Sequence, residues 1–502
     1  GMWGVLLLVA VPLWIGLALR ERRSPVEHAV SGEAPPSGRI IHSRTDALRG
    51  SVLEGVWGRI TIRPGPTRTA SARPARSTHP LHAGDGSMKR ISLVVAALLA
   101  LCAGSARAQQ GMLLYWWTQA GAEGEWQLRT VYQGGTVCPA PASVRAMPSD
   151  SFPVLVCQQR LDGTPVQLPE MPRPVAPPPS RVQRVVAIGD TGCRAEKQDC
   201  AVPADWPFAA VAYQAARAGG DLTVHVGDYI YRETVKDCGG HTPCGDNWAA
   251  WNADWFAPAG ELLPAAPWVF ARGNHEDCVR GGRGWFVFFD PRAMPAGGCA
   301  DTTDPYAVQV PGVGTLLIMD TACAPSYSPD CWPKNGQNDS ARAIPAYARQ
   351  FERLPGLIAA GEPAWLVTHV PTWARDFAGQ ADSAGSYILQ AALRRASPSG
   401  ELPAAVALSL VGHVHAWEGL DFAAPRAPVL VVGDGGTDES VGLPATLGSP
   451  AGGVAVDGYW SGLAFGYTVL QAAPNGWNVT LVPVSGTGGG ITCALVNGQL
   501  AC

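Results

Sequence analysis

The sequence predicts an α/β fold, and three observations support this class. Short apolar runs recur between residues 184 and 432, and each ends in a polar turn, as buried strands do. Helical patterns lie between some of these runs, and strands separated by helices indicate an α/β architecture. Gly (59) and Pro (44) are abundant among the 502 residues, while charged residues make up 16%, which favours a loop-rich fold over a helical bundle.

Seven apolar runs are the expected strands, and two stretches are the expected helices. One helix is expected after Asp205, which can cap it, and continues from about Trp206 to Gly219. The other is expected over about 340–354. Ligand sites of α/β folds cluster where strand ends meet, so we expect the polar turns to converge. The expected strands are 185–188, 222–226, 268–270, 316–319, 365–367, 408–411 and 429–432.

The beginning of the chain contains the pattern of a signal peptide. Residues 88–90 form a basic start, residues 91–104 are apolar, and 106–108 supply small residues two apart. This pattern predicts a signal peptide over 88–108 and a mature chain that begins at Gln109. The exported protein is then expected in the periplasm or outside the cell.

A second apolar run, at 3–19, has nearly the length of a short membrane anchor. A signal peptide behind 87 other residues makes little physical sense, however. We therefore interpret 1–87 as an over-extended or disordered N-terminal region, and we expect no stable membrane anchor in the mature form.

The rest of the chain divides into three segments. Residues 109–168 include the alternating run 126–132 and predict a small β-rich module, a candidate for contact with a surface or a protein. Residues 169–182 are rich in proline and predict a stiff, extended linker. Residues 183–502 then form the main domain.

The cysteines also favour export. Thirteen are present, and twelve remain once Cys102 leaves with the signal peptide, an even number that suggests disulfides in an oxidising compartment. They fall into neighbouring pairs along the sequence, each of which would close a short loop. The expected pairs are Cys138/Cys157, Cys193/Cys200, Cys238/Cys244, Cys278/Cys299, Cys323/Cys331 and Cys493/Cys502.

The charge of the chain argues against nucleic acid as a structural partner. The formal net charge of the chain is −4. Residues 1–108 contain more Lys and Arg than Asp and Glu, so the rest of the chain has a clear excess of acidic residues. An acidic body does not attract the phosphate backbone of nucleic acid through its overall field.

Five motifs follow the expected strands, and together they supply many metal-binding side chains. Carboxylates, a phenol, an amide oxygen and imidazoles suit iron, zinc or manganese. An aspartate can bridge two ions with its two oxygens, and two ions can clamp the attacking and leaving oxygens of a displacement. The motifs are Gly189-Asp190-Thr191-Gly192, Gly227-Asp228-Tyr229-Ile230-Tyr231, Gly273-Asn274-His275-Glu276, Leu366-Val367-Thr368-His369 and Gly412-His413-Val414-His415.

This ordered set resembles the purple acid phosphatases within the calcineurin-like metallophosphoesterases. The resemblance covers about 184–485 and implies a four-layer sandwich with two facing mixed β-sheets flanked by helices. In the wider superfamily a metal-binding His stands where this chain has Gly192. The purple subgroup lacks that His and uses the tyrosine of its second motif, which Tyr231 matches.

The resemblance also implies the site and its chemistry. A ferric ion would be held by Asp190, Asp228, Tyr231 and His415, with Asp228 bridging to a second ion. That second ion, a divalent Fe, Zn or Mn, would be held by Asn274, His369 and His413. His275 would bind the phosphoryl group and protonate the leaving oxygen. Hydrolysis of a phosphorylated small molecule would proceed by in-line attack of a metal-bound hydroxide.

Several alternatives remain open from the sequence. The same metals could serve a phosphodiesterase acting on nucleotides or phospholipid head groups, and a catalytically silent binding protein on this scaffold is a further possibility. Family members often carry a second His where this chain has Ala378, so Arg375 or Asp376 could take its place.

Three other features have simpler interpretations. Tyr231 could be an ordinary buried tyrosine with a satisfied hydroxyl. His225 is interpreted as a packed core histidine. Trp248, Trp251 and Trp255 are spaced like one packed helix face.

Overall fold

The computed structural model describes most of the chain from residue 111 onwards. The predicted N-terminal region 1–87, the signal peptide 88–108 and the start at Gln109 lie outside the described residues, as does half of the linker 169–182. None of the helices in this part is long and apolar enough to cross a membrane. The described residues are 111–502 without 169, 172–174, 176–177, 179, 235, 237, 327–330, 376–384, 439–442, 444–451 and 486–488.

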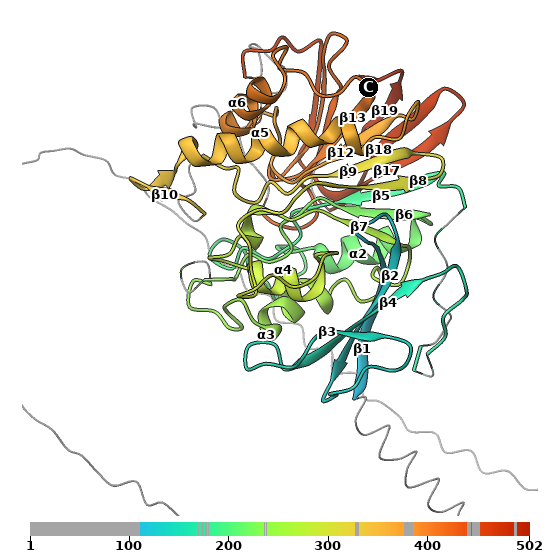
Figure 1. Cartoon of the computed structure of the whole chain (residues 1–502), viewed down its shortest axis with the longest axis vertical. Helices are drawn as coiled ribbons and strands as arrows, with labels where there is room; N and C mark the ends of the chain where they lie inside the picture. Colours follow the sequence, from blue (N-terminus) through green and yellow to red (C-terminus); the bar gives the residue numbers. More distant parts are fainter. Residues whose placement is uncertain are drawn as a thin grey trace, which may run out of the picture. The chain divides into compact units, whose positions relative to one another are not determined.

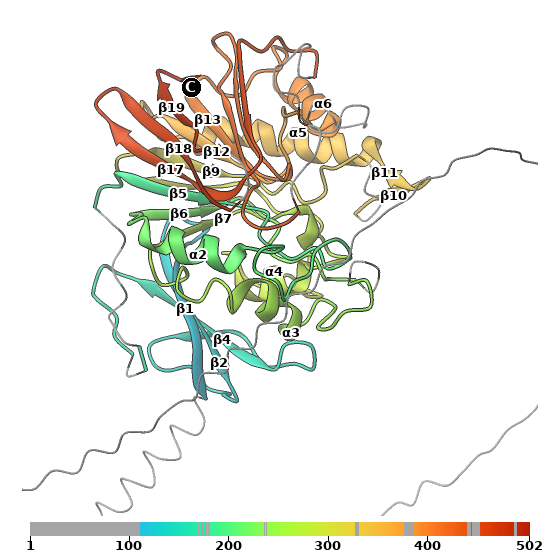
Figure 2. The ribbon, with the colours of Figure 1, turned by 180° about the vertical axis from the view of Figure 1, so that it is seen from behind.

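The first sheet has eleven strands in the order β20-β19-β18-β17-β5-β6-β7-β1-β2-β4-β3. Strands β5, β6 and β7 run parallel at its centre, while β17 and β18 pair antiparallel on one side of them (Figure 2). The strands are β1 (Met112–Ala120), β2 (Trp126–Gln133), β3 (Ser143–Ala146), β4 (Val154–Leu161), β5 (Arg184–Ile188), β6 (Leu222–His225), β7 (Trp268–Phe270), β17 (Phe465–Ala473), β18 (Gly476–Ser485), β19 (Thr492–Val496) and β20 (Gln499–Ala501).

The second sheet has seven strands in the order β16-β14-β15-β13-β12-β9-β8. Strands β9, β12, β13 and β15 are parallel, and antiparallel strands complete both edges. Its strands are β8 (Tyr306–Val310), β9 (Gly314–Ile318), β12 (Ala364–Val367), β13 (Val406–Val411), β14 (Trp417–Asp421), β15 (Val429–Val432) and β16 (Gly458–Gly462), and a separate ribbon pairs β10 (Pro333–Lys334) with β11 (Gln337–Asn338).

Helices cover the outer face of each sheet. Residues of α2, α3 and α4 share one buried cluster with the first sheet, and residues of α5 and α6 share another with the second (Figure 1). A third cluster contains side chains of both sheets and fills the space between them. The helical elements are α2 (Phe208–Arg217), α3 (Trp248–Trp251), the π-turn η1 (Asn252–Phe256), the 3₁₀ turn η2 (Asn274–Glu276), α4 (Gly282–Phe288), α5 (Ser340–Leu357) and α6 (Tyr387–Ala396).

Strand alternation explains why the central runs are apolar throughout. On β12, Trp365 and Val367 face the core between the sheets, whereas Ala364 and Leu366 face the helices α5 and α6. Successive side chains of a strand point to opposite faces, so a strand buried on both sides needs apolar residues at every position. The helix–sheet–sheet–helix arrangement confirms the expected four-layer α/β sandwich.

The β-rich segment expected at 109–168 is present as β1–β4, and it continues the first sheet. Strand β1 runs parallel to β7 through the pair Gln119 and Trp268. The Arg129 guanidinium donates hydrogen bonds of 3.1 Å to the carbonyls of Phe288, the last residue of α4, and of Asp290. Trp117 is fully buried in the cluster shared with those helices. These contacts attach the segment firmly to the main sheet.

The local expectations are met with one correction. All seven expected strands are present within one or two residues, and α5 matches the expected second helix. The predicted cap of the first helix is wrong, because α2 begins at Phe208 after Pro207, with no side-chain cap. The Asp205 carboxylate instead accepts a hydrogen bond from the backbone N–H of Asp199 within the preceding loop.

The six predicted disulfides are confirmed. Each joins the cysteines expected from their order along the chain, with sequence separations between 6 and 21 residues. Short crosslinks of this kind tie loops to neighbouring elements, which suits a fold with many irregular connections.

Candidate metal centre

The candidate site lies where strands of both sheets end. Asp190 follows β5, Asp228 follows β6 and Asn274 begins the turn after β7, all from the first sheet. His369 follows β12, while His413 and His415 follow β13, from the second sheet. The carboxyl ends of parallel strands therefore bring five separate segments together, as expected for an α/β fold.

The backbone is bent sharply at three of these residues. Asp190, Asp228 and His413 have φ angles of 53°, 60° and 74°, in the left-handed region that side chains other than glycine rarely adopt. Such conformations persist only where surrounding contacts hold them, and they gather at functional sites. Gly227 (φ 112°) allows the second motif to lie close to His369, because a Cβ on Gly227 would be 2.6 Å from the His369 imidazole.

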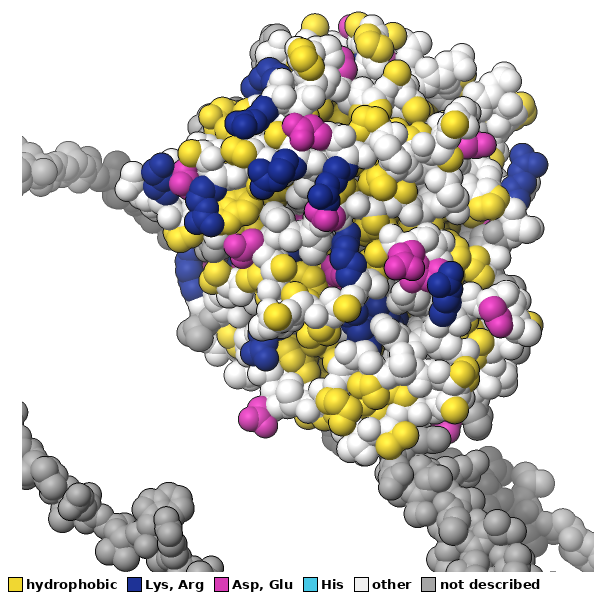
Figure 3. All heavy atoms as spheres, viewed as in Figure 1, with side chains coloured by type: hydrophobic (Ala, Val, Ile, Leu, Met, Phe, Trp, Pro, Cys, Tyr) yellow, Lys and Arg dark blue, Asp and Glu magenta, His cyan; other side chains and the backbone are white. Residues whose placement is uncertain are grey.

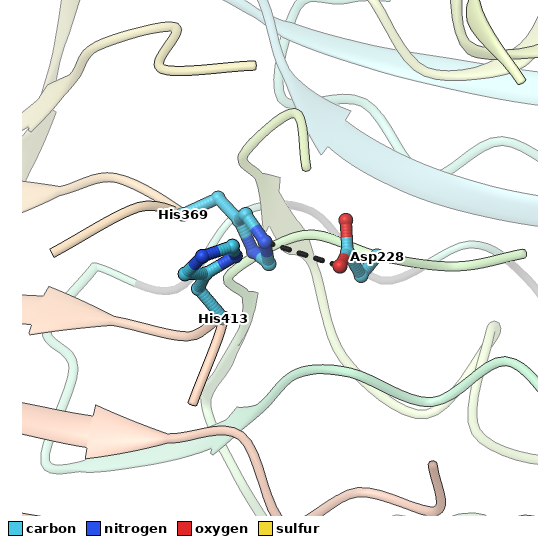
Figure 4. A group of neighbouring side chains, drawn as sticks. All are labelled: Asp228, His369 and His413. Atoms are coloured by element: carbon cyan, nitrogen blue, oxygen red, sulfur yellow. Dashed lines mark ion pairs between the residues drawn. The ribbon is translucent and has the colours of Figure 1, made fainter. Parts of the chain in front are cut away.

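One half of the site consists of Asp228, His369 and His413, whose ligand atoms lie within 4.8 Å of one another. Figure 4 shows the two imidazoles and the carboxylate pointing toward one another. The His369 Nε2 is 3.2 Å from the Asp228 carboxylate. The Asn274 amide oxygen completes this group, at 2.9 Å from His369 Nε2 and 2.6 Å from His413 Nδ1.

The other half consists of Asp190, Asp228 and His415, again within 4.8 Å, and all three are buried. The Tyr231 hydroxyl lies among them, at 3.2 Å from Asp190 Oδ1, 2.8 Å from Asp228 Oδ2 and 2.9 Å from His415 Nε2. Asp228 belongs to both halves. All seven residues that the sequence proposed as ligands are thus gathered in one place.

Hydrogen bonds outside the site orient the imidazoles. His369 Nδ1 lies 2.9 Å from the Val226 carbonyl, and His415 Nδ1 lies 2.8 Å from the Asp438 carbonyl. A carbonyl can only accept, so each Nδ1 carries the proton and each Nε2 presents its lone pair to the site. This tautomer is the one that a metal ligand requires.

The electrostatics of the site favour bound cations. Burial and the neighbouring Asp228 raise the pKa of Asp190 well above its ordinary value. Burial also lowers the pKa of His413 to about 3 and that of His415 to about 4, so both imidazoles are neutral near pH 7. Two adjacent buried carboxylates repel each other, and a cation between them relieves that repulsion. The donor set therefore fits two metal ions.

His275, the proposed catalytic residue, lies beside the Tyr231 side of the site. Its ring centroid is 4.0 Å from that of Tyr231, and its backbone N–H donates to the Asp228 carboxylate at 2.9 Å. Its Nδ1 contacts the carboxylate of Glu233, whose side chain is fully buried. This contact leaves Nε2 as the ring nitrogen available to a substrate.

Glu276 holds two of the motifs together, a role that the sequence did not predict. Its buried carboxylate accepts hydrogen bonds from the backbone N–H groups of Asp228 (3.0 Å), Tyr229 (2.9 Å) and Gly273 (3.0 Å). The residue stood in a quoted motif, but only the fold reveals that it binds the second motif as well as its own.

The structure also explains the glycine at the position of the usual histidine. A Cβ on Gly192 would lie 2.8 Å from the Tyr231 ring and 2.9 Å from the Ile230 backbone. A larger side chain at 192 and the tyrosine at 231 therefore exclude each other.

The simpler interpretations of other residues are confirmed. His225 is fully buried, stacks on Tyr229 at 4.0 Å and has its Nε2 3.1 Å from the Thr191 hydroxyl. Trp248, Trp251 and Trp255 pack in the core beside the first sheet. Asp376 and Ala378 lie outside the described residues.

A groove of about 1000 Å³ lies at the opposite end of the strands. It is bordered by the starts of β12 and β13, and its lining includes many alanines and prolines together with Trp365 and Trp477. It contains none of the proposed ligands, so size alone does not identify the site in this molecule.

The comparison with protein families agrees with the geometry. Residues 183–417 match the family model of the calcineurin-like phosphoesterases, a span that includes all five motifs, so the chain carries a calcineurin-like phosphoesterase domain. With two ligand groups assembled in that domain, the protein is a metal-dependent phosphoric ester hydrolase. The resemblance of the motifs to the calcineurin-like metallophosphoesterases is thereby confirmed.

Several solved structures are similar to this chain. A purple acid phosphatase from yellow lupin (Lupinus luteus) seeds has 14% identity and a TM-score of 0.45, covering 76% of this chain and 74% of that chain. PhoD has 11% identity and a TM-score of 0.43, covering 77% and 91%. The inner-membrane-complex anchor GAP50 of Plasmodium has 15% identity and a TM-score of 0.42, covering 63% and 89%. No curated protein matches the chain.

Proposed function

We propose that this protein is an exported phosphatase of the purple acid type, which hydrolyses phosphate monoesters at a dinuclear metal centre. The observation that carries the proposal is the pair of ligand groups that share Asp228, one of which includes the Tyr231 hydroxyl. A shared carboxylate suits two adjacent ions, and a phenol among hard donors suits a trivalent one.

The proposed ligand assignment follows the two halves. Asp190, Asp228, Tyr231 and His415 would hold a ferric ion, while Asn274, His369 and His413, together with the shared Asp228, would hold a divalent Fe, Zn or Mn ion. When bound, the metal pair supplies an activated water and neutralises charge on the phosphoryl group.

The chain's own residues position the substrate and move the proton. Glu233 orients the His275 ring through Nδ1, so Nε2 can reach a phosphoryl or leaving-group oxygen. Burial, with Arg280 and Arg194 nearby, holds the pKa of His275 well below its ordinary value.

Export is supported by the six disulfides, which persist in oxidising compartments, and by the signal-peptide pattern at 88–108. N-terminal sequencing of exported protein is expected to find Gln109 at or near the start. Material that still carried residues 24–87 would refute this part of the proposal.

The deciding experiment combines metal analysis of natively exported protein with kinetics on monoesters and diesters from pH 4 to 8. We expect two ions per chain, one of them iron, and a higher kcat/KM for monoesters than for diesters that share the same leaving group. A preference for diesters would favour the phosphodiesterase alternative, whereas two bound ions without either activity would favour a silent binding protein.

A further inference from the structure

A positively charged side chain lies at the rim of the candidate site and has no role in the assignment above. The Arg194 guanidinium lies over the Tyr231 ring, 5.5 Å from its centroid. Its side chain is 25% exposed, so it borders both the buried ligands and the solvent. Arginine stays charged at all accessible pH values and can bind two phosphate oxygens at once.

The loop that carries Arg194 is rigidly attached to the site. The disulfide Cys193–Cys200 closes it. Inside it, the Gln198 side chain accepts from the Arg194 N–H at 3.1 Å and donates to the Gly436 carbonyl at 3.0 Å. A side chain on such a loop can be presented in one orientation with little loss of entropy.

The Arg194 guanidinium forms an ion pair with a carboxylate, and the phosphate group of a substrate can take the place of that carboxylate. The Asp438 carboxylate lies 3.1 Å from the guanidinium, and its side chain is also 25% exposed. The preceding residue, Thr437, donates hydrogen bonds to the Asp190 carbonyl through its N–H and to the Gly192 carbonyl through its hydroxyl. The ion pair is therefore anchored at the first motif, and its partial exposure lets phosphate oxygens compete with Asp438. The nearby Glu196 is exposed, so water screens its charge.

We propose that Arg194 is a specificity-determining residue that favours dianionic phosphate monoesters over monoanionic diesters. The inference rests on the proposed function, since it concerns the substrate of the same site. A monoester presents two negative charges and a diester presents one, so a fixed cation at the rim stabilises the bound monoester more.

The test compares p-nitrophenyl phosphate with bis-p-nitrophenyl phosphate, which share a leaving group, in wild type, Arg194→Gln, Arg194→Lys and Lys197→Gln. Lys197 is the matched control, because it approaches the same Asp438 carboxylate at 3.5 Å but its side chain is 52% exposed. Metal content and melting temperature are measured for every variant, and inorganic phosphate serves as an inhibitor.

For Arg194→Gln we expect KM for the monoester and the inhibition constant of phosphate to rise about ten-fold, the effect of one charge-assisted hydrogen bond. The diester should change by no more than about two-fold on the same grounds. Arg194→Lys should recover part of the monoester preference, and Lys197→Gln should keep the wild-type ratio.

An unchanged ratio of monoester to diester kcat/KM in Arg194→Gln, with metal content intact, would overturn the assignment. If Arg194→Gln loses its metals, Asp438→Asn provides the test instead. Removing the carboxylate that competes for Arg194 should tighten inhibition by phosphate. Unchanged inhibition in Asp438→Asn would refute the proposed role of Arg194. Wild-type protein without either activity would instead refute the proposed function itself.

Discussion

The two halves of the candidate centre share Asp228 but differ in charge and exposure. Beside Asp228, one half offers neutral donors, the Asn274 amide and the imidazoles of His369 and His413, and His413 is partly exposed. The other half offers a second carboxylate and the Tyr231 hydroxyl, and its acidic and imidazole ligands are all buried. Anionic hard donors favour an ion of higher charge. Strand ends of the two sheets thus combine into two chemically different halves.

Basic and acidic side chains are interspersed over the face seen in Figure 3. At the centre, by contrast, two carboxylates are buried close together, and such an arrangement produces a strong local field.

The largest effect is expected where the two halves join. Asp228→Ala removes the residue common to both groups, so we expect metal content to fall below one ion per chain and kcat to fall by on the order of 10³-fold or more. Metal analysis and steady-state kinetics measure this, with the exposed Asp150→Ala as the control for loss of a carboxylate. Retention of two ions would contradict the shared role of Asp228.

Single-half variants separate the two sites. We expect His413→Ala and His415→Ala each to retain about one ion and to lose activity by roughly 10²-fold, the scale for perturbing a metal's surroundings. Iron-loaded His413→Ala should keep its visible colour, while His415→Ala should lose or shift it. Identical metal content and spectra in the two variants would show that the halves are not distinct.

Tyr231→Phe tests the donor that distinguishes the halves. A phenolate bound to ferric iron gives ligand-to-metal charge transfer, so we expect iron-loaded wild type to be purple or pink and the variant to lose most of that absorption. Activity should fall about ten-fold, less than in Asp228→Ala, because the bridge remains.

The spectrum can contradict this assignment in two ways. Full visible absorption in Tyr231→Phe with iron bound would show that Tyr231 is not a ligand. A colourless wild type that binds only zinc or manganese would reject the purple type and leave the phosphoesterase unaffected.

The smallest effect concerns pH in metal-free protein. The folded pKa of His413 is about 3, below the ordinary 6.5, so the unfolded chain binds one more proton between these values. Its contribution to the free energy of unfolding is therefore complete above pH 6.5 and is lost as pH falls toward 3. Asp190 and Glu276, whose pKa values are raised by burial, act in the opposite direction.

Comparison of wild type with a variant that lacks the imidazole isolates the contribution of His413. Denaturant unfolding is measured for chelator-treated wild type and His413→Asn from pH 7 to 4. The free energy of unfolding should fall more steeply with falling pH in wild type. The difference between the two slopes should correspond to the uptake of up to about one proton on unfolding. Equal slopes would mean that His413 is not held neutral by the fold.

Much of the site could be predicted from the sequence because the patterns that precede its residues are local. Asp190, Asp228 and His369 each follow an apolar run, and strand periodicity identifies such runs without a structure. The order of the five motifs then pointed to seven ligand candidates, and the structure brings all seven together. The pairing of the cysteines was equally local, since each disulfide closes a short loop.

Other features depended on the tertiary structure. Asp190 and His413 are 223 positions apart, yet the backbone N–H of His413 donates to the Asp190 carboxylate. The hydrogen bonds between Glu276 and two motifs likewise arise from segments packed across the fold. The same is true of the steric conflict between a side chain at 192 and the Tyr231 ring.

By itself, the sequence determined the strands and the disulfide pairs, because hydrophobic periodicity and short-range spacing act over a few residues. The candidate donor residues came from the resemblance of the ordered motifs to a known family. Only the tertiary structure decided that Glu276 binds two of the motifs, that β1–β4 extend the first sheet, and that Arg194 meets Asp438 at the rim of the centre. Contacts between distant segments leave no local pattern, since they are set by how the two sheets and their loops pack together.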